Sequence, residues 1–212
     1  FNDLTVLIGK NDIGKSSVLE ALDIFFDNKK IDSDDVNIIA RQNGESAKLT
    51  VIFKNIPNEL DIDSGGKTKL NEEYLLDKDG LLKIKKDYSS LSKPKTYILC
   101  HHPSNENAND LFYLNITQLQ KRVKELGVEG DFKANTKNEI RKAIWNSLGD
   151  SIELQHTELE TGKDGVKDIW EKLTPHFPLF ALFQADRKND EKDKEIQDPL
   201  KVAAEQALKK HL

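Results

Sequence analysis

The sequence predicts an α/β fold that begins with a strand, a glycine-containing loop and a helix. Residues 4–8 (LTVLI) are a continuous apolar run, as expected of a buried strand in a parallel sheet. After the loop at residues 9–16, apolar side chains recur with the spacing of one helix face, at Val18, Leu22, Phe25 and Phe26. Several later strand-like stretches without intervening helices predict an antiparallel β layer beside this unit.

Residues 9–16 (GKNDIGKS) match G-x-x-x-x-G-K-[ST], the phosphate-binding loop (P-loop, or Walker A motif) of nucleoside triphosphatases. Gly9 and Gly14 let the backbone fold around a phosphate without an obstructing Cβ atom. Backbone N–H groups of the loop and of the helix N-terminus would point towards the anion. Lys15 would reach the β- and γ-phosphates as a catalytic residue, and the Ser16 hydroxyl would bind Mg²⁺. The predicted nucleotide-binding residues are Gly9, Lys10, Asn11, Asp12, Ile13, Gly14, Lys15, Ser16 and Ser17.

The remaining segments predict further strands and helices, which do not follow one another in a regular alternation. Alternation or apolar runs predict strands at residues 47–56, around 81–84, at 96–100, 151–160 and 177–183. Helical spacing predicts helices at residues 116–126, 137–148, 166–173 and from 198 to the end of the chain. The first two of these helices are separated by glycines, so residues 104–150 are interpreted as a helical insertion. Residues 28–42 and 58–69 read as loops, and the two tryptophans, Trp145 and Trp170, as core residues.

The composition of the chain argues against some classes of protein. The net charge of −5 argues against a general attraction to nucleic acid, although a local basic patch remains compatible with it. No stretch approaches the length of an apolar membrane span, and no signal-peptide pattern opens the chain. The single cysteine, Cys100, excludes an internal disulfide framework and favours a reducing, cytoplasmic compartment. Because the sequence contains no Met and opens just before a core strand, we expect it to be a fragment.

Other motif-like patterns carry less weight. Residues 28–32 (NKKID) miss the spacing of a GTPase base-reading motif, and residues 64–66 (SGG) read as a turn. Cys100, His101 and His102 are adjacent on a predicted strand, so their side chains alternate between faces and can hardly share one metal ion. No apolar run is followed directly by the Asp-Glu pair that ATP hydrolysis normally requires. Asp186 and Arg187 come closest, and a site role and a solvated strand end are equally open for them.

Residues 4–17 (LTVLIGKNDIGKSS) and the following Leu19-Glu20-Ala21-Leu22 resemble the Walker A motif and first helix of the SMC/RecF/OLD branch of ABC-type ATPases. Residues 180–187 (FALFQADR) are similar to the strand that leads out of the first lobe in OLD-like bacterial ATPases. The resemblance implies that Gln184 is the Q-loop glutamine, which in the family contacts Mg²⁺ and the attacking water.

The same resemblance implies that residues 1–212 are an incomplete ABC-type ATPase domain, its N-terminal lobe. The second lobe, with the signature and Walker B motifs, is expected after Leu212, and no nuclease activity can be assigned to these residues. The implied cofactors are ATP and Mg²⁺. The implied assembly is a head-to-head homodimer of the full-length protein that couples ATP hydrolysis to conformational change in DNA repair or anti-phage defence.

Two alternatives belong to other classes. A P-loop kinase for a small acceptor would need lid arginines near the phosphates, and the chain has only Arg41, Arg122, Arg141 and Arg187. A non-catalytic interaction domain would use the P-loop only as a structural turn.

Overall fold

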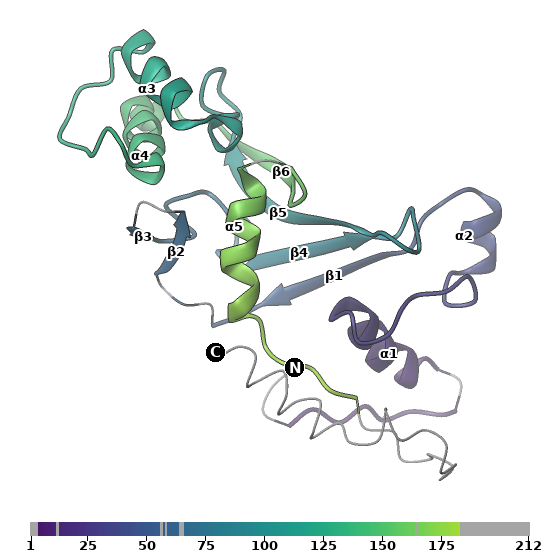
Figure 1. Ribbon diagram of the computed structural model, residues 1–212. Helices are drawn as coiled ribbons and strands as arrows, with labels where there is room; N and C mark the ends of the chain where they lie inside the picture. The colour runs from purple at the N-terminus through teal and green to yellow at the C-terminus, as the bar shows by residue number, and fades with distance from the viewer. Residues whose placement is uncertain are drawn as a thin grey trace.

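A four-stranded antiparallel sheet is the centre of the fold (Figure 1). The computed structural model describes residues 4–11, 13–55, 57, 59–63, 66–163 and 165–182. The sheet has the strand order β1-β4-β5-β6, and β2 pairs with β3 in a separate hairpin. The strands are β1 (Lys48–Phe53), β2 (Leu60–Asp63), β3 (Gly66–Thr68), β4 (Leu82–Asp87), β5 (Lys95–Pro103) and β6 (Leu154–Glu160). The helices are α1 (Lys15–Phe25), α2 (Ile38–Gln42), α3 (Ile116–Glu125), α4 (Lys137–Leu148) and α5 (Val166–Leu173), with 3₁₀ turns at Leu111–Tyr113, Gly149–Ser151 and Thr174–His176.

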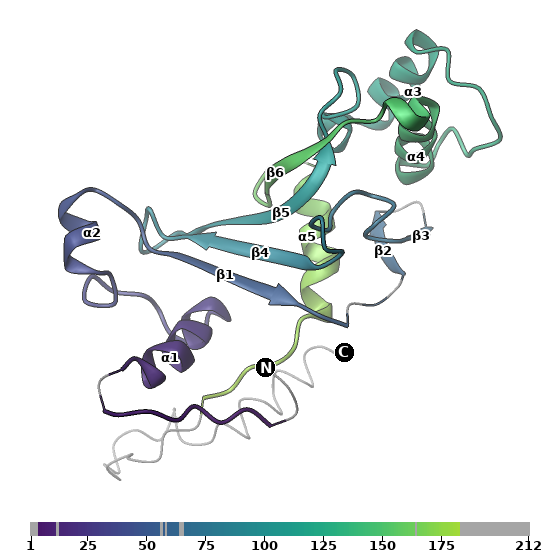
Figure 2. The ribbon, with the colours of Figure 1, turned by 180° about the vertical axis from the view of Figure 1, so that it is seen from behind.

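The two faces of this sheet differ because side chains alternate along each strand. One row of apolar side chains crosses all four strands in register on the inner face, at Val51, Ile84, Ile98 and Leu159. Ile84 and Ile98 are fully buried. Helix α5 lies across this inner face, as Figure 1 shows, and the opposite face is turned to the viewer in Figure 2. The predicted antiparallel β layer is therefore confirmed.

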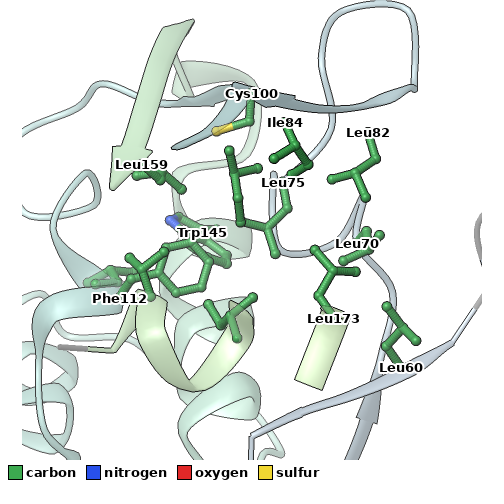
Figure 3. Close-up of a cluster of buried hydrophobic side chains, with 14 of the residues drawn as sticks. Leu60, Leu70, Leu75, Leu82, Ile84, Cys100, Phe112, Trp145, Leu159 and Leu173 are labelled. Atoms are coloured by element: carbon green, nitrogen blue, oxygen red, sulfur yellow. The ribbon is translucent and has the colours of Figure 1, made fainter. Parts of the chain in front are cut away.

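The core lies between the inner face of the sheet and the helices, and Figure 3 shows its central side chains. Trp145 of α4 is 2% exposed, and its indole Nε1 donates a hydrogen bond to the carbonyl oxygen of Ala108 at 3.0 Å. Gly165 starts α5 at φ 84°, where an added Cβ would lie 1.7 Å from the carbonyl oxygen of Phe112. A glycine is needed there because backbone atoms cannot move aside as a side chain can. Trp145 is confirmed as a core residue, and Trp170 packs against the same cluster while half-buried.

Helices α3 and α4 occupy the predicted positions and contact one another. Asn115 and Gln118 form a capping box at the start of α3, in which each side chain accepts a hydrogen bond from the other residue's backbone N–H. Leu119 of α3 and Ile140 of α4 are fully buried in the same cluster as the sheet. The hairpin therefore shares the core of the sheet instead of forming one of its own.

A buried ion pair ties α4 to the turn after β3. The guanidinium Nε of Arg141 donates to Oε2 of Glu73 at 2.8 Å, and the two side chains are 4% and 2% exposed. The Arg141 guanidinium also lies 4.8 Å from the centre of the Phe112 ring. Charges removed from water in this way stabilise a fold only while both partners are present.

His102 on β5 is held as a neutral imidazole in the same region. Its ring stacks on Phe112 with centroids 5.3 Å apart, and its Nδ1 lies 3.3 Å from the carbonyl oxygen of Tyr74. Burial lowers the pKa of His102 to about 4, and the nearby Arg141 charge acts in the same direction, against the raising effect of the Tyr74 carbonyl.

Two predicted strands are wrong over the residues that the structure describes. Residues 4–8 are not in a strand, and Leu4, Val6 and Ile8 are 83%, 66% and 87% exposed. Residues 177–182 are also not in a strand, and Phe183 lies outside the described residues. A strand requires hydrogen-bonding neighbours, and the ladders of the described residues pair neither segment. Apolar composition indicates which side chains prefer burial, whereas the hydrogen-bonding partner of a strand is decided by the tertiary structure.

Two elements were missed in segments interpreted as loops. Helix α2 begins after Asn37, whose side chain accepts hydrogen bonds from the N–H groups of Ile39 and Ala40 at 2.9 and 3.2 Å. This N-cap was readable from the sequence, because asparagine is a preferred residue there. The β2–β3 hairpin lies in the segment 58–69, whose turn-forming composition concealed two short strands. No helix of the described residues has both the length and the apolarity of a membrane span.

The Glu73→Ala variant should lose about 3 kcal/mol or more of unfolding free energy, because it leaves the Arg141 charge buried without this partner. Chemical denaturation checks this. Glu72→Ala is the matched control, since Glu72 pairs with Lys142 of the same helix at 3.0 Å but is 31% exposed. The control should lose about 1 kcal/mol at most. Equal losses in the two variants would contradict the role given to the buried pair.

Stability should fall on acidification because of His102. The folded-state pKa lies below the ordinary value of 6.5, so the unfolded chain binds the proton more tightly. The contribution of neutral His102 to the free energy of unfolding is fully present above pH 6.5 and is lost as the pH falls towards about 4. Between roughly pH 7 and roughly pH 5 it amounts to about 2 kcal/mol at most. Denaturation of His102→Phe over this range should show a correspondingly shallower pH dependence, and an unchanged slope would contradict the assignment.

Candidate functional site

The glycine-containing loop leads directly into α1, as the sequence predicts. The helix begins at Lys15, immediately after Gly14, which adopts the left-handed conformation with φ 88° and ψ 15°. A residue with a Cβ atom is strained at this angle, so the second glycine of the motif permits the turn from loop to helix. Among the described residues, no side chain forms a capping hydrogen bond at the start of α1, and the first turn contains no acidic residue. The N–H dipoles of this helix end are therefore available to an anion.

The Lys15 ammonium is held by the loop itself. Its Nζ donates hydrogen bonds to the carbonyl oxygen of Gly9 at 2.9 Å and to that of Lys10 at 2.6 Å. An ammonium group has three N–H donors, so a third can reach an oxygen of a bound phosphate. The two carbonyl contacts fix where the positive charge sits before a ligand arrives. This reduces the ordering cost that a flexible lysine would otherwise add to binding.

The Ile13 side chain lies over the first glycine of the motif. An added Cβ at Gly9 would lie 1.9 Å from Cδ1 of Ile13 and 3.1 Å from its Cγ1. Ile13 is 60% exposed, so the end of its side chain can rotate away, and this contact does not by itself require glycine at position 9. Ser16 and Ser17, in the first turn of α1, are exposed, so their hydroxyl groups are accessible to a ligand.

The second half of α1 attaches the loop to the sheet. Ile24 and Phe25 are buried, and the Phe25 ring lies 6.3 Å from that of Phe53 on β1. Val18, at the other end of the same predicted face, is 44% exposed. The predicted apolar face is therefore covered only at its C-terminal end, and the loop end of the helix projects from the core.

Of the other residues considered from the sequence, Gln184, Asp186 and Arg187 lie outside the described residues, as does Asp12 within the loop. Cys100 and His102 are buried while His101 is partly exposed, which confirms that adjacent side chains of β5 face opposite ways. Burial raises the pKa of the Cys100 thiol to about 12, so it is not a reactive thiolate.

One juxtaposition escaped the sequence reasoning about histidines. His156 of β6 lies directly opposite His101 of β5 across the β5–β6 pair. Register is decided by strand pairing, so no local signal could have revealed it. Within the described residues, no group of three or more His, Cys, Asp or Glu side chains is arranged to hold a metal ion.

A comparison with protein families assigns the whole chain. A family model described as an AAA ATPase domain matches residues 1–212. The chain belongs to the AAA ATPase domain family. Membership supports ATP binding and hydrolysis in general terms and agrees with the mixed α/β fold and its antiparallel sheet. No curated protein and no solved structure matches the chain.

The Gly14→Ala variant of this AAA ATPase domain should bind ATP at least about fivefold more weakly, because a residue with a Cβ atom is strained at φ 88° and the turn from the loop into α1 would be distorted. Titration calorimetry of ATP with Mg²⁺ measures the change. Gly80→Ala is the matched control, since Gly80 also has a positive φ, 72°, but lies in the turn before β4. It should keep the ATP affinity within about threefold, and equal losses in the two variants would contradict the role given to Gly14.

Proposed function

We propose that this AAA ATPase domain binds ATP with Mg²⁺ through the loop Gly9 to Ser17, as part of an OLD/SMC-like ATPase. The observation that carries the proposal is the Lys15 ammonium, held inside the loop by the Gly9 and Lys10 carbonyl oxygens at the open end of α1. The ammonium group stabilises the turn through these two hydrogen bonds and keeps a third N–H donor for a phosphate oxygen. A phosphate-binding loop needs a cation there.

Each residue of the loop has a proposed role. Lys15 would bind the β- and γ-phosphates and stabilise the charge that develops during phosphoryl transfer. Ser16 would bind Mg²⁺ through its exposed hydroxyl, and the first-turn N–H groups would receive phosphate oxygens. Magnesium favours such hydroxyl and phosphate oxygens. Gln184 is proposed as a further ligand of Mg²⁺ and of the attacking water, on the sequence resemblance alone.

The wider assembly is also a proposal. In the ATPases that the sequence resembles, ATP is held between two heads, so the loop needs an open outer side. Lys10, Asn11 and Ser17 are exposed in this way, which supports a head-to-head homodimer of the full-length protein. Conformational work on DNA, in repair or anti-phage defence, follows from the same resemblance.

A kinase of small acceptors is less well supported. The fork of Arg122 holds the carboxylate of Asp110 at 2.9 and 3.0 Å, and Arg141 is buried against Glu73. Arg41 donates to the carbonyl oxygen of Ser33 at 3.0 Å, and Arg187 lies outside the described residues. The three described arginines thus have structural contacts, and we do not propose them as a phosphate lid.

The Lys15→Ala variant should weaken ATP binding by about tenfold or more, because it removes a charged hydrogen bond to phosphate. Calorimetric titration of ATP with Mg²⁺ is the measurement, with circular dichroism to show that the variant is folded. Lys10→Ala is the control, since Lys10 contributes its backbone carbonyl to the same loop and its side chain is exposed. It should keep its affinity within about threefold.

Equal losses in Lys15→Ala and Lys10→Ala would point to a diffuse charge effect and against a formed phosphate site. Loss of folding in Lys15→Ala would favour the interaction-domain alternative. Because the sequence contains no Asp-Glu pair directly after an apolar run, we also expect residues 1–212 alone to hydrolyse ATP slowly. Fast turnover by this chain would overturn its assignment as one lobe of a larger site.

A further inference from the structure

The two ends of α1 touch different parts of the molecule. Its first residue, Lys15, belongs to the phosphate-binding loop, and the turn after its last residue contacts residues 177–182. The helix has 11 residues, which corresponds to about 16 Å of rigid helix. A change at the loop end can therefore reach residues 177–182 through a single element.

Three side chains make this contact, and we call Phe26, Asn28 and Phe180 the clasp. The Asn28 Nδ2 donates a hydrogen bond to the carbonyl oxygen of Phe180 at 2.9 Å, and lies 3.2 Å from Oδ1 of Asp23 inside α1. The ring of Phe26 stacks on that of Phe180, with centroids 5.5 Å apart and an interplanar angle of 14°. One asparagine amide thus links the helix to a segment 152 residues away in the sequence.

The clasp matters because residues 177–182 belong to no strand of the described part of the chain. At its start the segment is anchored by Phe177, whose ring stacks on Phe53 at 4.4 Å and meets Trp170 edge-on at 5.4 Å. Three residues later, Phe180 is the next position with a defined side-chain and backbone contact, and that contact is to α1. The path of the segment after Phe177 is thus set against the phosphate-loop helix.

We propose that Asn28 is a positioning residue that couples nucleotide occupancy of the loop to the placement of residues 177–182. The coupling rests on the proposed ATP site and extends it. Phosphate binding adds contacts to the loop and to the N-terminal end of α1, and so restricts their motion further. The more rigid helix then keeps the hydrogen bond from Asn28 to the Phe180 carbonyl closed for more of the time, so residues 177–182 become less mobile when nucleotide is bound.

The chemistry of the contact gives a discriminating variant. Asn28→Asp is nearly isosteric, but it replaces the donor with a carboxylate that faces two oxygen atoms, those of Asp23 and Phe180. In the double variant Asp23→Asn/Asn28→Asp, the amide at position 23 can donate to the carboxylate at position 28, so the hydrogen bond within the helix end is restored. The net charge of the double variant equals that of the native chain. The double variant leaves the Phe180 carbonyl without a donor. The pair therefore separates a local helix-end role of Asn28 from its role in the clasp.

The experiment is NMR of the chain, read on the carbonyl ¹³C resonance of Phe180, the acceptor of the clasp hydrogen bond, with and without Mg·ATP. The affinity for Mg·ATP is titrated on the same samples. In the native chain, saturating Mg·ATP should shift this resonance downfield, because the carbonyl is hydrogen-bonded to the Asn28 amide for more of the time. In Asn28→Asp and in Asp23→Asn/Asn28→Asp the shift should vanish, while the affinity stays within about threefold of native.

The matched control is Asn109→Asp, since the Asn109 amide also donates to a backbone carbonyl, that of Ser104 at 3.4 Å, away from α1. It should leave the Phe180 carbonyl shift intact. If the double variant keeps this shift, or the native chain binds Mg·ATP without it, the coupling is wrong and the nucleotide site stands. Absence of Mg·ATP binding to the native chain would overturn both the nucleotide site and the coupling.

Discussion

Burial of one face of the antiparallel sheet is the constraint on which the rest of the structure depends. The row from Val51 through Ile84 and Ile98 to Leu159 is apolar on every strand, and water must be excluded from it. Helix α5 lies across this face (Figure 1), and the buried residues of α5, of the α3–α4 pair and of the sheet belong to one cluster. Burial also explains the state of the polar groups in that region: Glu73 and Arg141 form an ion pair, and His102 is neutral.

The glycine-containing loop at residues 9–16 lies outside this core. It is joined to the sheet through the second half of α1, where Phe25 meets Phe53 and Lys86 of β4 reaches Asp27 at 2.6 Å. The loop end of the helix and the segment before it are exposed. Anchoring one end of a rigid helix while leaving the other accessible is what a ligand-responsive element requires, because its position can then report on the ligand.

The conformation of the loop depends almost entirely on its own residues, and for that reason the helix that follows it could be predicted. Two glycines, a lysine and the start of a helix lie within eight consecutive residues. The structure adds the left-handed angle of Gly14, the position of the Ile13 side chain over Gly9, and the two carbonyl oxygens that receive the Lys15 ammonium. The match of the whole chain to the AAA ATPase domain family agrees with this reading. The clasp at the other end of α1 had no such signal, since Asn28 and Phe180 are brought together only by the fold.

The sequence by itself determined the elements whose information is periodic or contiguous. Helices α3, α4 and α5, the strands of the main sheet and the glycine-containing loop before α1 all follow from spacing that a short window contains. Only the tertiary structure decided which strands are neighbours, that His101 faces His156, and that residues 4–8 and 177–182 lack strand partners in the described part of the chain. The physical reason is that an apolar run carries a preference for burial in its own side chains. Its hydrogen-bonding neighbour and its register depend on residues far away in the sequence.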